Sequence, residues 1–189
     1  MDFKRIREQI IKDPLNQEFT KRGIGPLFQL SKQTKILIIG QAPGLKAMES
    51  QTVFNDKSGD TLRSWLGINR ETFYNKDLIG VLPMDFYYPG KGAVGDLPPR
   101  VAIAEKYHPL ILNELNHVKL ILLVGKYAQD YYLKDKETLT NRVKNYQTYL
   151  PTYFVLPHPS PLNFRWIKKN TFFYEVLDVL KEKIKEILK

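Results

Sequence analysis

The segment His158-Pro159-Ser160-Pro161-Leu162-Asn163 places a histidine and a serine on a short stretch that prolines stiffen. It directly follows the apolar run 153–156, which predicts a buried strand. A histidine at the end of such a strand can donate a hydrogen bond to a ligand atom that gains negative charge. His108 and His117 lie in or beside a predicted helix, so we expect structural roles for them and a functional role for His158.

A second segment, Gly40-Gln41-Ala42-Pro43-Gly44, follows the apolar run 35–39. Taken alone, it could be a strand-to-helix turn in which glycine supplies permissive backbone angles. It lacks the Lys-Ser/Thr ending of a phosphate-binding P-loop. The segment becomes informative beside the histidine segment, because both follow predicted buried strands.

The residue inventory excludes several kinds of chemistry. The chain contains no cysteine, which excludes disulfides, cysteine-ligated zinc, iron–sulfur clusters and thiol catalysis. Three isolated histidines form no paired metal-ligand motif. Ser160 and His158 lie two residues apart with no nucleophile elbow, which disfavours a serine hydrolase. We therefore expect no metal site.

Strands and helices alternate along the chain, which predicts an α/β fold. The predicted strands are 35–39, 78–82, 120–124 and 153–156, and the predicted helices are 2–13, 60–66, 101–115, 126–133, 137–145 and 172–188. We expect a single three-layer domain with a central, mostly parallel four-stranded sheet flanked by helices. The 189 residues fit one domain, 1–189, with an N-terminal helical extension at about 1–30.

Three loops follow the predicted strands and differ in composition from the rest of the chain. They span residues 40–60, 83–100 and 157–169. Functional loops of an open α/β sheet gather at the carboxyl ends of its strands. We therefore expect these three loops to converge on one site.

The charge balance favours a polyanionic partner. Lys and Arg number 29 against 20 Asp and Glu, which gives a formal net charge of +9. No segment reaches the roughly 18 to 20 apolar residues that span a bilayer, and the N-terminus lacks the apolar run of a secretory signal. These features predict a cytoplasmic protein that does not enter a membrane.

These segments resemble the uracil-DNA glycosylase superfamily, from about Ile36 to Trp166. Residues 40–44 resemble its first motif, residues 120–129 resemble its third strand and the following helix, and residues 158–163 resemble its last motif. The wider pattern is similar to a cysteine-free bacterial branch. The resemblance implies a monofunctional DNA glycosylase of base-excision repair that acts on DNA without a cofactor, and we expect it to be a monomer.

The resemblance also implies roles for residues of the first and last motifs. Catalytic roles fall to His158, which would stabilise the departing base, and to Gln41, whose neighbouring amides would help. Leu162 takes the place of the residue that inserts into DNA. The remaining motif residues implied to contact substrate are Gly40, Ala42, Pro43, Ser160 and Asn163.

The first motif departs from known branches in its acidic residue. The best-known uracil enzymes have a water-positioning Asp where this chain has Ala42, and the iron–sulfur branch has Glu where it has Gln41. A further branch uses an Asp in a downstream Asp-x-Ser-Gly segment, which residues 56–59 resemble. Asp56 is therefore the leading catalytic carboxylate. Asp60 is the alternative, unless it serves only at a helix start.

Two further positions have roles that the resemblance implies for the base. Phe54 resembles the aromatic residue on which the extruded base stacks, although a phenylalanine can equally belong to the core. Many members place a base-reading Asn after the second strand. Asp85 occupies that region here and is our candidate for reading the base.

The residues after the last motif are basic. Arg165, Lys168 and Lys169 are candidates for phosphate contacts, although an exposed basic helix start would have the same composition.

Two other functions stay open at this point. The chain could be a catalytically weak or inactive nucleic-acid-binding member of the superfamily, which the missing acid and the missing Asn favour. It could also be a small-molecule nucleotide enzyme that uses the same pocket. The sequence leaves the preferred base open.

Overall fold

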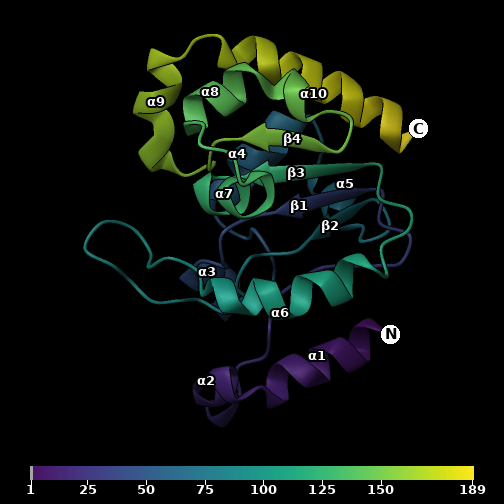
Figure 1. Cartoon of the computed structure of the whole chain (residues 1–189), viewed down its shortest axis with the longest axis vertical. Coiled ribbons are helices and arrows are strands. Elements are labelled where there is room, and N and C mark those ends of the chain that lie inside the picture. Colours follow the sequence, from purple (N-terminus) through teal and green to yellow (C-terminus); the bar gives the residue numbers. More distant parts are fainter. Residues whose placement is uncertain (1) are drawn as a thin grey trace.

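A computed structural model describes residues 2–189 and contains one four-stranded parallel sheet. The strands are β1 (Ile36–Ile39), β2 (Ile79–Val81), β3 (Leu120–Val124) and β4 (Tyr153–Leu156), in the order β2-β1-β3-β4 (Figure 1). All three pairings are parallel. The predicted α/β domain with a central parallel sheet flanked by helices is confirmed.

Burial on both faces explains why these strands are apolar throughout. Every residue of β1 is fully buried, and in the view of Figure 1 helix α7 (Lys126–Leu133) lies in front of the sheet and α4 (Lys57–Leu66) behind it. A strand covered on both sides needs a continuous hydrophobic run rather than an alternating one. The predicted runs therefore locate the strands to within one residue at each end.

The other helices complete the domain. They are α1 (Phe3–Lys12), α2 (Gln17–Lys21), α3 (Leu45–Glu49), α5 (Arg70–Tyr74), α6 (Val101–Leu112), α8 (Leu139–Lys144), α9 (Phe164–Lys169) and α10 (Phe173–Leu188). Short 3-10 turns occupy Pro14–Asn16, Tyr146–Tyr149 and Pro161–Asn163. Helices α3 and α5 lie where the sequence predicted no helix, because five residues are too few to show a helical period.

Helix α4 begins three residues earlier than predicted. The carboxylate of Asp56 accepts a hydrogen bond from the amide of Gly59 at 2.9 Å and caps the helix. The helix ends at Gly67, which adopts a φ of +66°. The residue proposed as the catalytic carboxylate is therefore also the residue that starts α4.

The N-terminal arm, helices α1 and α2, packs on the far side of α6 (Figure 1). Buried Asp13 accepts hydrogen bonds from Lys106 Nζ at 2.5 Å and from the Tyr107 hydroxyl at 2.6 Å, both on α6. Farther along, Gln29 exchanges backbone hydrogen bonds with Val81 at 2.7 and 3.0 Å. The arm thus leads into a segment that covers the outer edge of β2.

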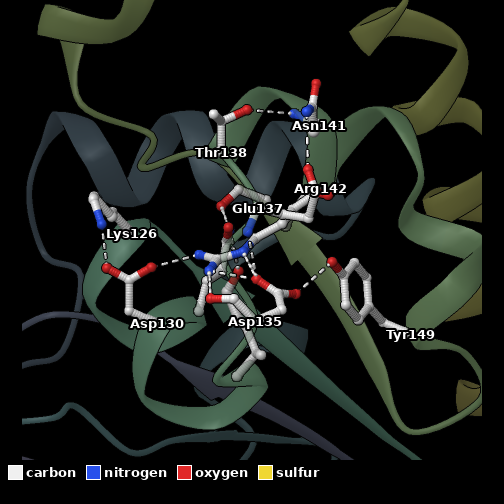
Figure 2. A network of polar contacts seen from close by, with 11 residues as sticks. Lys126, Asp130, Asp135, Glu137, Thr138, Asn141, Arg142 and Tyr149 are labelled. Carbon is white, nitrogen blue, oxygen red and sulfur yellow. Dashed lines mark hydrogen bonds and ion pairs between the residues drawn. The ribbon is translucent and has the colours of Figure 1, made fainter.

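A cluster of polar side chains between α7 and α8 surrounds Arg142, whose side chain is 2% exposed (Figure 2). Its guanidinium donates to Asp130 at 2.6 Å and to Asp135 at 2.7 Å. The Tyr149 hydroxyl donates to Asp135 at 2.8 Å, and Lys126 pairs with Asp130. Each charged group of this cluster, hereafter the Arg142 cluster, therefore has a partner of opposite charge.

Candidate functional site

A cavity of about 400 Å³ opens at the carboxyl edge of the sheet. All three loops that were expected to converge contribute to its wall. The residues that carry polar or aromatic groups into it are Gln41, Phe54, Asp56, Ser58, Asp96, Tyr127, His158, Ser160 and Asn163. Its size suits a ligand of the dimensions of a nucleoside.

His158 follows β4 and lies against the end of β3. Gly125, which ends β3, has a φ of +86°, and a Cβ on it would stand 3.4 Å from the Cβ of His158. Asn163 Nδ2 donates to the His158 carbonyl at 2.7 Å, and Ser160 Oγ accepts from the Leu162 amide at 3.3 Å. The side chains of the last motif therefore hold the loop that presents the histidine.

The imidazole of His158 lies in the cavity wall and is available to a ligand. Burial lowers its pKa, and the carboxylates of Asp56 and Asp96 oppose that shift without reversing it. Within residues 2–189, no hydrogen bond engages either ring nitrogen. A neutral imidazole carries one N–H, so His158 can donate one hydrogen bond into the cavity.

Phe54 is held in a conformation that non-glycine residues rarely adopt, with a φ of +50°. Its carbonyl oxygen accepts from Arg63 Nη1 at 3.3 Å and lies so close to Gly59 that a Cβ there would approach it to 1.7 Å. The ring tip lies 3.6 Å from the position of a Cβ on Gly40. The backbone of α4 thus fixes a half-buried aromatic ring in the cavity wall. A phenylalanine that served only in the core would need neither this backbone conformation nor this exposure.

One carboxylate oxygen of Asp56 accepts a hydrogen bond from the backbone of α4, and the other is directed at the first motif. Oδ1 caps α4, while Oδ2 lies 3.6 Å from the position of a Cβ on Gly44. In the described chain Asp56 forms no ion pair. Asp60, the alternative carboxylate, is 72% exposed, pairs with Arg63 at 2.6 Å and lies outside the cavity wall.

Asp96 also faces this point, although the sequence did not indicate a role for it. Its Oδ2 lies 3.9 Å from the same Cβ position on Gly44, and its Oδ1 accepts from the Tyr88 hydroxyl at 3.2 Å. The sequence could have suggested Asp96 through its position in the loop 83–100, because this loop was expected to reach the site. The segment 95–100, which contains Asp96, also belongs to the wider pattern of the resemblance, but the resemblance implied no role for this residue.

Asp85 lies away from the cavity, so the structure gives no support to its predicted role in reading the base. The side chain is fully buried, and its oxygens accept from Arg100 Nε at 2.7 Å and from Nη2 at 2.8 Å. Asp85 is not among the residues that line the cavity, and both of its oxygens face the guanidinium in the interior. Pro83 stands in the cavity wall near this strand end instead.

The first motif is bound to the loop that follows β2. The Gly40 carbonyl accepts from the Met84 amide at 2.9 Å, and the Gln41 carbonyl accepts from the Asp85 amide at 3.1 Å. Gln41 Nε2 donates to the Leu97 carbonyl at 3.1 Å, so this side chain tethers loop 83–100. Ala42 and Pro43 line the cavity between these contacts.

The mouth of the cavity is apolar on the last-motif side. Leu162 is 70% exposed, and its Cδ1 lies 3.9 Å from the position of a Cβ on Gly95. The three basic candidates Arg165, Lys168 and Lys169 lie exposed on α9, outside the cavity wall. Trp166 Nε1 donates to Thr140 Oγ1 at 2.9 Å and anchors this helix to α8.

His108 lies outside the cavity and has a structural environment. It is buried, its ring contacts the Tyr132 hydroxyl at 2.6 Å and the Pro83 carbonyl at 3.0 Å, and burial lowers its pKa to about 4. Across residues 2–189, no cluster of three His, Asp or Glu side chains could hold a metal ion. In the same range, no helix has the length and apolar character needed to cross a membrane.

Comparisons with known proteins connect this geometry to a family. A family model for the uracil DNA glycosylase superfamily matches residues 28–181. The fold is also similar to a solution NMR structure described as a "putative Uracil DNA glycosylase" from Methanosarcina acetivorans, with 18% sequence identity and a TM-score of 0.47. That alignment covers 83% of this chain and 97% of the other.

Proposed function

The chain belongs to the uracil DNA glycosylase superfamily, and we propose that it is a monofunctional DNA glycosylase that hydrolyses the N-glycosidic bond of a deaminated base. The observation that carries this proposal is the convergence of Phe54, Asp56 and His158 on one cavity of about 400 Å³. An aromatic surface, a carboxylate and a neutral hydrogen-bond donor are the groups that base excision requires.

A flipped base would stack on Phe54. An enzyme that acts on a base within duplex DNA must turn the nucleotide out of the stack into a pocket. The left-handed backbone of Phe54 and the contact of its carbonyl with Gly59 hold the ring in place before substrate arrives. Because the platform is already ordered, binding loses little conformational entropy there.

His158 and Asp56 would act on opposite charges. As the glycosidic bond breaks, its electron pair leaves with the base and positive charge develops on the sugar. The N–H of His158 can donate to a base oxygen that becomes negative. Asp56 Oδ2, which is free of an ion pair in residues 2–189, faces the first motif and can stabilise the positive sugar.

The mouth of the cavity fits a DNA ligand. Leu162 is exposed beside the opening and could fill the gap that a flipped nucleotide leaves in the duplex. Arg165, Lys168 and Lys169 follow on α9 and could contact the adjacent phosphates.

The experiment that tests this function uses a panel of oligonucleotides. The purified chain is incubated with strands that bear uracil, hypoxanthine or xanthine, and abasic sites are cleaved with alkali. Cleavage at one modified base, with none in the matched normal strand, is the expected result and identifies the substrate. Tight binding without cleavage would instead favour a nucleic-acid-binding member, and hydrolysis of free nucleosides alone would favour a small-molecule enzyme.

A further inference from the structure

Asp96 lies on a tight hairpin inside the loop that leads from β2 to α6. The Leu97 amide donates to the Gly90 carbonyl at 2.9 Å, and the Gly92 amide donates to the Gly95 carbonyl at 2.9 Å. Gly90 and Gly95 adopt φ values of +104° and +74°, which favour glycine. Figure 1 shows this teal loop projecting from the left-hand side of the domain. Its internal hydrogen bonds give Asp96 a defined position.

The carboxylates of Asp96 and Asp56 face one point from two loops. Their Oδ2 atoms lie 3.9 and 3.6 Å from the position of a Cβ on Gly44. The two oxygens are therefore no farther apart than the sum of these distances. Glycosidases that keep a water between two carboxylates hold them roughly 6.5–9.5 Å apart. The upper limit on the distance between the Asp56 and Asp96 oxygens falls in the lower part of that range.

Each carboxylate has one oxygen engaged and one available. The engaged oxygen of Asp96 accepts from Tyr88, and that of Asp56 accepts from the Gly59 amide. Within residues 2–189, neither side chain forms an ion pair, although 29 Lys and Arg are present in the chain. The free oxygen of each carboxylate is therefore available to a proton or a positive charge on a ligand.

We propose that Asp96 is a second catalytic carboxylate, an inference that rests on the proposed glycosylase function. Asp96 accepts a proton from the attacking water while Asp56 faces the positive charge on the sugar. The water oxygen bonds to C1′ as the C1′–N bond breaks, and the electron pair of that bond leaves with the base. The proton passes from Asp96 to solvent, and the base takes up a proton in turn.

This assignment accounts for the alanine in the first motif. Ala42 lines the cavity but has no group that can orient water. Asp96 reaches the neighbouring Gly44 from a different loop, so the hairpin can supply the carboxylate that the motif itself lacks.

The test compares three variants in single-turnover excision. Asp96→Asn keeps the shape and the hydrogen bond from Tyr88 but cannot accept the proton, so we expect the rate to fall about 10²- to 10⁴-fold. Tyr88→Phe should give a smaller fall, because it only frees the carboxylate to move. Asp178→Asn, on the exposed face of α10, is the matched control and should leave the rate unchanged.

Binding to DNA that contains an abasic site separates chemistry from recognition. Asp96→Asn should bind this DNA as tightly as the wild type. An equal loss of binding and rate would overturn the inference, since Asp96 would then serve binding. Wild-type excision by Asp96→Asn would overturn it too and leave the proposed function standing. A wild-type chain that excises none of the bases would overturn both.

Discussion

Both the Arg142 cluster and the cavity bring two carboxylates together, but only the Arg142 cluster pairs them with a guanidinium. At Arg142, a buried guanidinium meets the carboxylates of Asp130 and Asp135 at 2.6 and 2.7 Å. At the cavity, Asp56 and Asp96 stand near each other with no cation within the described residues to pair with. One region has its charges neutralised by the fold, and the other leaves negative charge for a ligand.

Structural and functional carboxylates differ in whether the fold supplies them with a cation. Removing one partner of a buried ion pair is strongly destabilising, because the other charge loses its compensation. Carboxylates that lie at a cavity without an ion pair are candidates for chemistry, even where one of them, Asp56, also caps a helix. Variants of the Arg142 cluster should therefore change stability, and variants at the cavity should change rate.

The largest effect is expected for His158→Ala. Losing a preorganised donor to developing negative charge costs about 3 to 4 kcal/mol of transition-state stabilisation. Single-turnover excision measures this loss. Folding should be unaffected, because the ring has no hydrogen-bond partner in residues 2–189, and circular dichroism checks this point. An unfolded variant would place His158 with Arg142 among the structural residues.

Arg142→Met should destabilise the fold by roughly 3 kcal/mol, at the low end for a broken buried pair, because Asp130 is partly exposed. Urea unfolding measures the change, and Arg5→Met on the exposed face of α1 is the matched control. The excision rate per folded molecule should stay at the wild-type value. A lower rate in the folded fraction would show that the two regions are coupled.

Acid should weaken the Arg142 cluster. Burial alone would raise the pKa of Asp135, but hydrogen bonds from Arg142 and Tyr149 hold it below its ordinary value. A carboxylate with a depressed folded pKa contributes stability that is present above the unfolded pKa, about 3.9, and is lost as pH falls through the folded value. Unfolding measured from pH 6 downward should show a steeper loss for the wild type than for Arg142→Met. Parallel curves would contradict this account.

The smallest effect is expected for Leu162→Ala at the cavity mouth. The side chain is 70% exposed, so stability should not change. Excision from duplex DNA should fall about tenfold, a part of the few kcal/mol needed to unstack a base step. Excision from a single strand of the same sequence should change less, because no stack must be kept open. Equal losses on both substrates would rule out the wedge.

The fold was readable from the sequence because its strands are buried on both faces. A residue such as Ile38, fully buried within β1, belongs to an uninterrupted apolar run, and a run of this length between loops is typical of a parallel strand. Helices α3 and α5 were missed, since five residues cannot display a hydrophobic period. The predicted start of α4 lies three residues too late, because Asp56 and not Asp60 caps the helix.

The site was less readable, because the direction of a side chain in a loop depends on distant partners. Asp85 follows β2 as expected, but Arg100, fifteen residues later, draws its carboxylate into the interior. Asp96 reaches the cavity only because a glycine-rich hairpin turns back on itself. Neither outcome follows from local composition. The position of His158 at the cavity was easier to predict, because this residue follows a strand closely.

The ion pair of Arg100 has a consequence for how relatives of this chain vary. The guanidinium also donates to the Leu15 carbonyl at 2.6 Å and to Asn16 Oδ1 at 3.0 Å, so the N-terminal arm braces the end of the loop that carries Asp96. The family model matches only from residue 28 onward. Substitutions in the arm can therefore move that loop while every motif residue stays the same, so the arm is a place where relatives can differ without a change in any motif.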